Sequence, residues 1–187
     1  SGQVLTSGGS GAAPTWADAG GGAYELIQKQ TISSNVSSVT FTTTTAPQEQ
    51  LVLILNGVRM NADGLVLLYY RDSSGNLLST DSNGDGVYEL TARYNSSGTS
   101  GDVAEDNISK IQLNAGNQAE YLNKDIHSQV NIFGWGTTQP YLFAQTLSTR
   151  SYDDRIIHTK MAARYLNKAG ATTVPAQIQL QTQVASQ

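Results

Sequence analysis

Apolar and polar residues alternate along much of this chain, and this two-residue period constrains the fold more than any other feature of the sequence. In the segment Val36–Thr43, Val39 and Phe41 fall on one face, while Ser38 and Thr40 fall on the other. This is the pattern of a β-strand with one buried face, and apolar residues at helical spacing are scarce. We therefore expect an all-β protein.

Ten segments have the composition of strands, and clusters of Gly, Asn, Asp and Ser separate many of them, as at residues 61–64, 73–76 and 95–98. Short strands at this spacing are typical of a β-sandwich or jelly roll. The predicted strands are Tyr24–Gln30, Val36–Thr43, Leu51–Asn56, Leu65–Arg71, Val87–Tyr94, Ile108–Leu113, Gln129–Trp135, Tyr141–Leu147, Arg155–Tyr165 and Gln177–Val184.

The composition excludes several classes of protein. The net charge is -4 and no basic run occurs, whereas a nucleic-acid binder needs clustered Lys and Arg. With no cysteine, the chain has neither a disulfide framework nor a thiolate zinc site. The longest apolar run, Leu51–Leu55, is too short to span a bilayer. We expect no nucleic-acid partner and no membrane insertion.

The first sixteen residues, SGQVLTSGGSGAAPTW, have a different character. Val4 and Leu5 form a short apolar hook, a Gly/Ser/Ala run follows, and Pro14 and Trp16 close the segment. A segment with so few apolar residues cannot bury itself within one subunit. It is either a disordered linker or an extended stalk, in which small residues let parallel chains approach closely and Val4, Leu5 and Trp16 contact neighbouring subunits.

This segment resembles the GQVLTS-x-G-x-G-x-APxW element of tail fibres and other virion appendages of bacteriophages, notably those of marine and cyanobacterial hosts. There the element precedes a C-terminal β-rich head. The resemblance implies a stalk and trimerisation segment at residues 1–22, a β-sandwich head at residues 23–187, and a homotrimer located in the virion. Because the chain begins at Ser1, inside the element, we expect a fragment or a processed product.

A looser similarity to the same heads extends along the chain. Residues 32–41 resemble their opening strands, and residues 162–165 and 178–180 resemble their closing strands. The family heads usually finish with L-Y-G, and this chain has QTQVASQ at that point.

The resemblance implies a non-enzymatic structural protein of the virion. A tail-fibre head would attach the particle to a host-surface glycan or protein. The alternative is a purely structural component, such as a capsid decoration, neck or baseplate protein that contacts other virion proteins, and a polysaccharide depolymerase is the second alternative. The sequence has no G-x-S-x-G motif, and His127 and His158 lack the spacing of a metalloenzyme motif.

Residues 81–89, DSNGDGVYE, match the first half of a calcium-binding loop. Asp81, Asn83 and Asp85 place oxygen ligands at alternate positions, and Gly86 suits the sharp turn. Position twelve of such a loop, however, is Ala92, where a bidentate carboxylate is needed. Asn-Gly and Asp-Gly are also hairpin signals. A hairpin without metal is the favoured interpretation, Ca²⁺ is the alternative, and we expect no other cofactor.

Two further regions are candidates for receptor contact. The polar, acidic segment Asn95–Asp106 is expected to be a loop, either a solvated connection or a recognition loop that uses Asp102 and Glu105. Trp135 belongs to the second region.

That second region is the aromatic cluster formed by Phe133, Trp135, Tyr141 and Phe143. In regular strands the first two would share one face, and so would the last two. Aromatic rings of this kind either pack in a core or stack against sugars. Core packing is the favoured interpretation, with Trp135 as the expected exposed exception that contacts a receptor.

Overall fold

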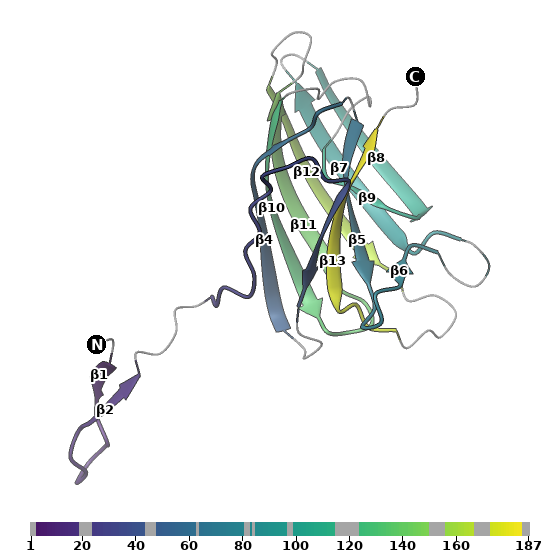
Figure 1. The fold of residues 1–187 in the computed structure, drawn as a ribbon. Helices are drawn as coiled ribbons and strands as arrows, with labels where there is room; N and C mark the ends of the chain where they lie inside the picture. The colour runs from purple at the N-terminus through teal and green to yellow at the C-terminus, as the bar shows by residue number, and fades with distance from the viewer. Residues whose placement is uncertain are drawn as a thin grey trace. The chain divides into compact units, whose positions relative to one another are not determined.

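The computed structural model describes residues 3–18, 24–43, 48–62, 64–80, 83, 85–96, 99–114, 124–149, 156–166 and 173–184. The chain divides into two compact units, Ser1–Thr31 and Ile32–Gln187, whereas the sequence interpretation divided it after residue 22. The described residues form strands and turns and contain no helix (Figure 1). The all-β prediction is confirmed.

The N-terminal unit contains a short antiparallel hairpin. Strand β1 (Gln3–Thr6) pairs with β2 (Thr15–Asp18), and Leu5 lies opposite Trp16. The Gly-rich run between them closes the turn, with φ of 88° at Gly9 and 92° at Gly11, a conformation that favours glycine. Residues 3–18 therefore fold back on themselves and do not form the extended stalk segment that we predicted.

The larger unit is a β-sandwich of two antiparallel sheets (Figure 1), as predicted, while the jelly-roll connectivity stays a prediction. One sheet has six strands, in the spatial order β4, β10, β11, β12, β7 and β8. Their bounds are β4 (Gln48–Arg59), β7 (Tyr88–Ser96), β8 (Thr99–Ile108), β10 (Asp125–Trp135), β11 (Tyr141–Thr149) and β12 (Ile156–Tyr165).

The second sheet has five strands and follows the order β3, β13, β5 and β6, with β9 also paired to β5. Its strands are β3 (Ser38–Thr42), β5 (Gly64–Arg71), β6 (Leu77–Leu78), β9 (Ile111–Gln112) and β13 (Gln177–Val184). Strand β5 lies between partners and is buried on both faces. At Gly64 a Cβ atom would lie 2.2 Å from the Gln183 carbonyl oxygen, so only glycine fits there.

Two local predictions are wrong. The segment Tyr24–Gln30 alternates like a strand but forms none, because its side chains lie exposed to solvent and gain no burial. The segment Asn95–Asp106 is not a loop, because β7 and β8 form a hairpin through it. Strand β8 is the edge of its sheet, where polar and acidic residues are expected and the apolar alternation is weak.

An aromatic cluster in the core joins the two sheets. The ring of Tyr70, on β5, lies 5.4 Å from Trp135, 5.9 Å from Tyr88 and 6.1 Å from Tyr165, each in an edge-on arrangement. The Tyr88 hydroxyl accepts a hydrogen bond from the Tyr70 N–H at 3.0 Å and donates one to the Leu78 carbonyl. Burial in this cluster raises the pKa of both Tyr70 and Tyr88 far above the ordinary tyrosine value.

Strand β10 departs from simple alternation near its end. Gly134 has a φ of 65°, and Trp135, which follows it, is 0% exposed, whereas Phe133 is only half-buried. The prediction that Phe133 and Trp135 share a face is wrong, because the left-handed residue between them interrupts the two-residue period.

Candidate functional site

The outer face of the six-stranded sheet carries large apolar side chains that are exposed to solvent. They come from the first, third and fourth strands in spatial order, and all of them occupy outward positions. These residues are Ile54, Tyr141, Phe143, Leu147 and Ile156.

Three rings at one end of this face form a group that we call the aromatic platform, defined by Phe133, Tyr141 and Phe143. Phe133 and Tyr141 are register partners on β10 and β11, and their rings stack with centroids 5.3 Å apart and 21° between planes. Phe143 follows on the same face of β11. Tyr141 is 54% exposed and Phe143 37% exposed, so ring surface is open to a ligand.

Neutral amide side chains border the platform. Asn131 is the register partner of Phe143. Its Oδ1 accepts hydrogen bonds from Gln50 Nε2 at 2.9 Å and from Gln129 Nε2 at 3.3 Å. Gln145 lies opposite Gln129 on β11. These contacts hold amide donors and acceptors in place beside the rings.

Charged residues on the other side of the platform form a pair. Arg164 is the register partner of Tyr141, and its Nη2 donates a hydrogen bond to Glu89 Oε2 at 2.6 Å. Ala162, the register partner of Phe143, adds no charge. Lys160 lies beyond it, opposite Gln145, and forms no ion pair with another described residue.

The opposite end of the face has two shallow depressions around Leu147, with volumes of about 470 and 500 Å³. His127 and His158 flank Leu147 in register on the neighbouring strands. His127 Nδ1 lies 3.1 Å from Asn56 Oδ1 and also accepts a hydrogen bond from the Gly57 N–H at 3.3 Å. Both histidines of the chain therefore border one apolar depression.

An exposed ion pair lies at the rim of this end. Arg59 donates to both carboxylate oxygens of Asp125, at 2.8 and 3.1 Å. The hydrogen bond to Arg59 lowers the pKa of Asp125, and the same contact raises the pKa of Arg59. The two charges of this pair compensate each other.

The structure separates the residues that we predicted for receptor contact. Trp135 is in the core, so its prediction as the exposed member of the aromatic cluster is wrong, and Tyr141 and Phe143 are the exposed members. Asp102 and Glu105 lie on strand β8 and not in a loop, and Asp102 Oδ1 lies 3.6 Å from Arg93 Nε. None of the three belongs to the platform.

Two of the three predicted metal ligands, Asn83 and Asp85, lie within the described residues. Thr80 and Gly86 form an isolated antiparallel bridge, and Asn83 and Asp85 are exposed between them, as the hairpin interpretation expects. Asp81 lies outside the described residues. Within the described part of the chain, no group of three His, Asp or Glu side chains is arranged to hold a metal. Calcium binding at this turn stays a prediction.

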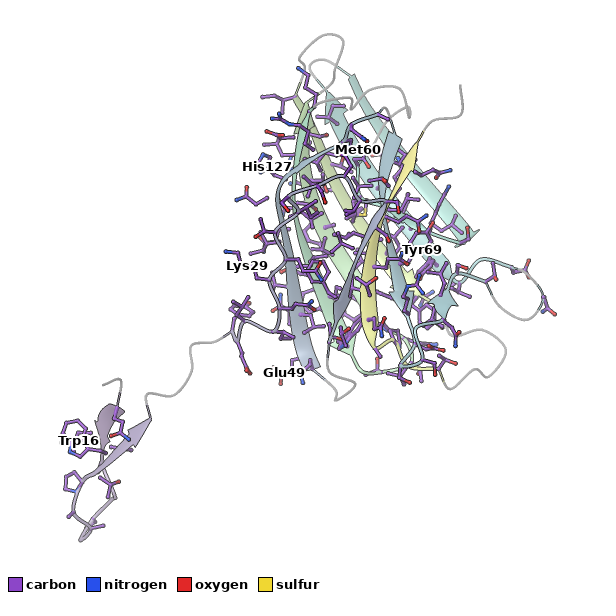
Figure 2. The ribbon with its side chains drawn as sticks, in the orientation of Figure 1. Trp16, Lys29, Glu49, Met60, Tyr69 and His127 are labelled. Atoms are coloured by element: carbon purple, nitrogen blue, oxygen red, sulfur yellow. The ribbon has the colours of Figure 1, made fainter. Side chains whose placement is uncertain are left out.

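The predicted subunit contacts lie on the N-terminal hairpin. Leu5 is 58% exposed and Trp16 is 68% exposed, and they are direct register partners, so their side chains share one face of the hairpin. Figure 2 labels Trp16 on this element. The side chain of Val4 is outside the described part of the structure. The trimer stays a prediction.

The sequence interpretation missed the amide residues Gln50, Gln129, Asn131 and Gln145. The signal was present, because Gln129, Asn131 and Phe133 occupy alternate positions, and so do Tyr141, Phe143 and Gln145. The pattern assigns each set to one face but does not indicate which face meets solvent.

Comparisons with protein-family models, curated proteins and solved structures found no match for this chain. Across the ranges that the structure describes, no helix is long and apolar enough to cross a membrane.

Proposed function

We propose that this protein is the head of a bacteriophage tail fibre or a similar virion appendage and that it attaches the particle to the host surface. The resemblance of residues 1–16 to the appendage junction element supports the class of protein. The observation that carries attachment is the open outer face of the six-stranded sheet, where exposed rings lie beside fixed amides. The role we propose is binding without catalysis.

A sheet face suits this role for a physical reason. Its side chains are held by the backbone ladder and by contacts among themselves, so little entropy is lost when a ligand binds. Each site can then be weak, because several copies on one particle act together by avidity.

We propose that the head is a homotrimer held through the hairpin. An isolated two-stranded hairpin is marginally stable in water, so covering Leu5 and Trp16 with neighbouring copies would stabilise it. Trp16→Ala should therefore reduce the mass measured by light scattering from trimer to monomer, with Tyr24→Ala, an exposed ring outside the hairpin, as the control. A Trp16→Ala protein that remains trimeric would place the subunit contact in the sandwich.

One observation favours the structural alternative. The end of the sheet face around Leu147 is apolar, with Ile54 and Ile156 also exposed, and such a patch suits contact with another protein. In that case a second virion protein would cover this face.

Cell binding and the position in the particle distinguish these functions. The fluorescently labelled full chain should bind marine bacterial or cyanobacterial cells saturably, and unlabelled protein should compete. Antibody labelling of whole particles should locate the protein at a free distal tip. An epitope buried among other virion proteins, with no cell binding, would favour the scaffold. Release of reducing sugar from host polysaccharide would identify a depolymerase.

A further inference from the structure

We infer that the aromatic platform binds a neutral polysaccharide of the host surface, an inference that rests on the attachment function proposed above. The exposed rings of Tyr141 and Phe143 provide apolar surface at adjacent outward positions of β11. Pyranose rings present C–H groups on their faces, and these groups pack against aromatic rings. Phe133, stacked on Tyr141, fixes the orientation of that ring.

The amides supply the polar half of the recognition. A sugar that lies on Phe143 has Asn131 at its side, and the Asn131 amide is already oriented by Gln50 and Gln129. Amides both donate and accept hydrogen bonds, as sugar hydroxyls do. A small number of oriented polar groups beside an apolar surface is the usual composition of a small-molecule site.

The charges around the platform indicate a neutral ligand. Next to Tyr141, the charge of Arg164 is compensated by Glu89 at 2.6 Å. Next to Phe143 lies Ala162. Lys160 lies two residues from Ala162 on β12, opposite Gln145 and not opposite a ring. Among the residues that the structure describes, no uncompensated cation lies directly beside the rings to meet an anionic ligand.

The shape of the face indicates the inner units of a chain as the ligand. Outward positions continue along β10 from Phe133 to Gln129, a distance of roughly 13 Å at the usual rise of a strand. The rings lie on an open sheet face and not in a closed pocket, so they do not select a chain end. An extended polysaccharide can lie across the platform with several units in contact.

The test uses the full chain, labelled and added to cells that the wild-type protein binds. Tyr141→Ala and Phe143→Ala should each weaken binding by about tenfold, because each substitution removes one ring that packs against a sugar unit. The matched control is Leu147→Ala, an exposed outward residue of the same strand, which should bind like the wild type. Lys160→Ala should also bind like the wild type, and high salt should have little effect. All four variants should have the same melting temperature as the wild type.

Treatment of the cells identifies the class of receptor. Periodate, which cleaves vicinal diols of sugars, should abolish binding, whereas protease treatment should leave it intact. In affinity electrophoresis, the extracted neutral polysaccharide should retard the wild type and not the two platform variants.

Each contrary outcome has a distinct meaning. Cell binding that survives both ring substitutions, or that protease abolishes and periodate does not, would overturn the glycan platform and leave attachment standing. Weaker binding in Lys160→Ala together with strong salt sensitivity would replace the neutral ligand with an acidic one. Absence of binding to any cell by well-folded wild-type protein would count against attachment itself.

Discussion

The two outer faces of the sandwich differ in how far their apolar side chains are exposed to solvent. On the five-stranded sheet, Leu65, Leu67 and Tyr69 form a cluster apart from the main core, and each is 9% exposed or less. On the six-stranded sheet, Ile54 is 70% exposed and Tyr141 is 54% exposed. Figure 2 shows Tyr69 and His127, a residue of the exposed face, at opposite sides of the sandwich.

Glutamines of β13 explain part of the protection on the five-stranded sheet. Gln179 lies opposite Tyr69, is buried, and accepts a hydrogen bond from Arg71 Nε at 2.8 Å. Gln183 lies opposite Leu65 and accepts one from Lys110 Nζ at 2.8 Å. Long side chains with fixed polar ends keep their aliphatic stems over neighbouring apolar groups.

The six-stranded sheet has amides as well but uses them differently. Gln50 and Gln129 donate to Asn131 beside the rings, and the rings stay exposed. Exposure on this face is therefore not a consequence of lacking long polar side chains. The difference supports the binding role that we propose for these rings.

The largest effect expected from this comparison is in Leu67→Ala. The side chain is 1% exposed, so truncation should lower the free energy of unfolding by about 2–5 kcal/mol through lost burial and a residual cavity. Leu147→Ala is the same change on the exposed face and should cost less than about 1 kcal/mol. Urea unfolding of both variants measures the difference, and equal costs would show that the two faces are equally covered.

A smaller effect is expected in Gln179→Ala. The substitution removes the hydrogen bond to Arg71 and part of the cover of Tyr69, and should lower the free energy of unfolding by about 1–3 kcal/mol. Gln145→Ala, an exposed glutamine of the other sheet, is the control and should unfold like the wild type. If Gln179→Ala is equally neutral, the glutamine does not contribute to the covered face.

The smallest effect concerns the exposed rim and depends on pH. Arg59 holds the pKa of Asp125 below its ordinary value of 3.8. The ion pair therefore stabilises the folded state fully above pH 3.8. This stabilisation is lost as the pH falls through the lower pKa of the folded state, because the carboxyl group binds a proton more readily in the unfolded chain. Asp125→Asn should have a slightly lower melting temperature than the wild type at pH 7, and the difference in melting temperature should disappear below pH 3.8. A gap that is constant with pH would exclude this ion pair as its cause.

Strong local patterns predicted their strands well. Gln177–Val184 was predicted with the observed bounds of β13, because Gln and apolar residues alternate there. The continuous apolar run at Leu65–Arg71 became β5, which is buried on both faces. Strand β8 was missed, since an edge strand needs neither alternation nor apolar mass.

The candidate site was harder to predict, because solvent exposure follows from neighbours. Phe133, Tyr141 and Phe143 were identified as a cluster, but core packing was the favoured interpretation for them. The structure assigns the core position to Trp135 and leaves the other rings on the surface. One left-handed residue, Gly134, separates the two environments.

Alternation along the chain was sufficient to predict an all-β protein, most of its strands and the two faces of the regular ones, since these depend on the local geometry of the backbone. The tertiary structure alone decided which face meets water and which residues become neighbours. Gln50 and Asn131 are 81 residues apart, yet their side chains are hydrogen-bonded because β4 pairs with β10. Such pairings depend on the packing of the whole sandwich, which no local pattern encodes.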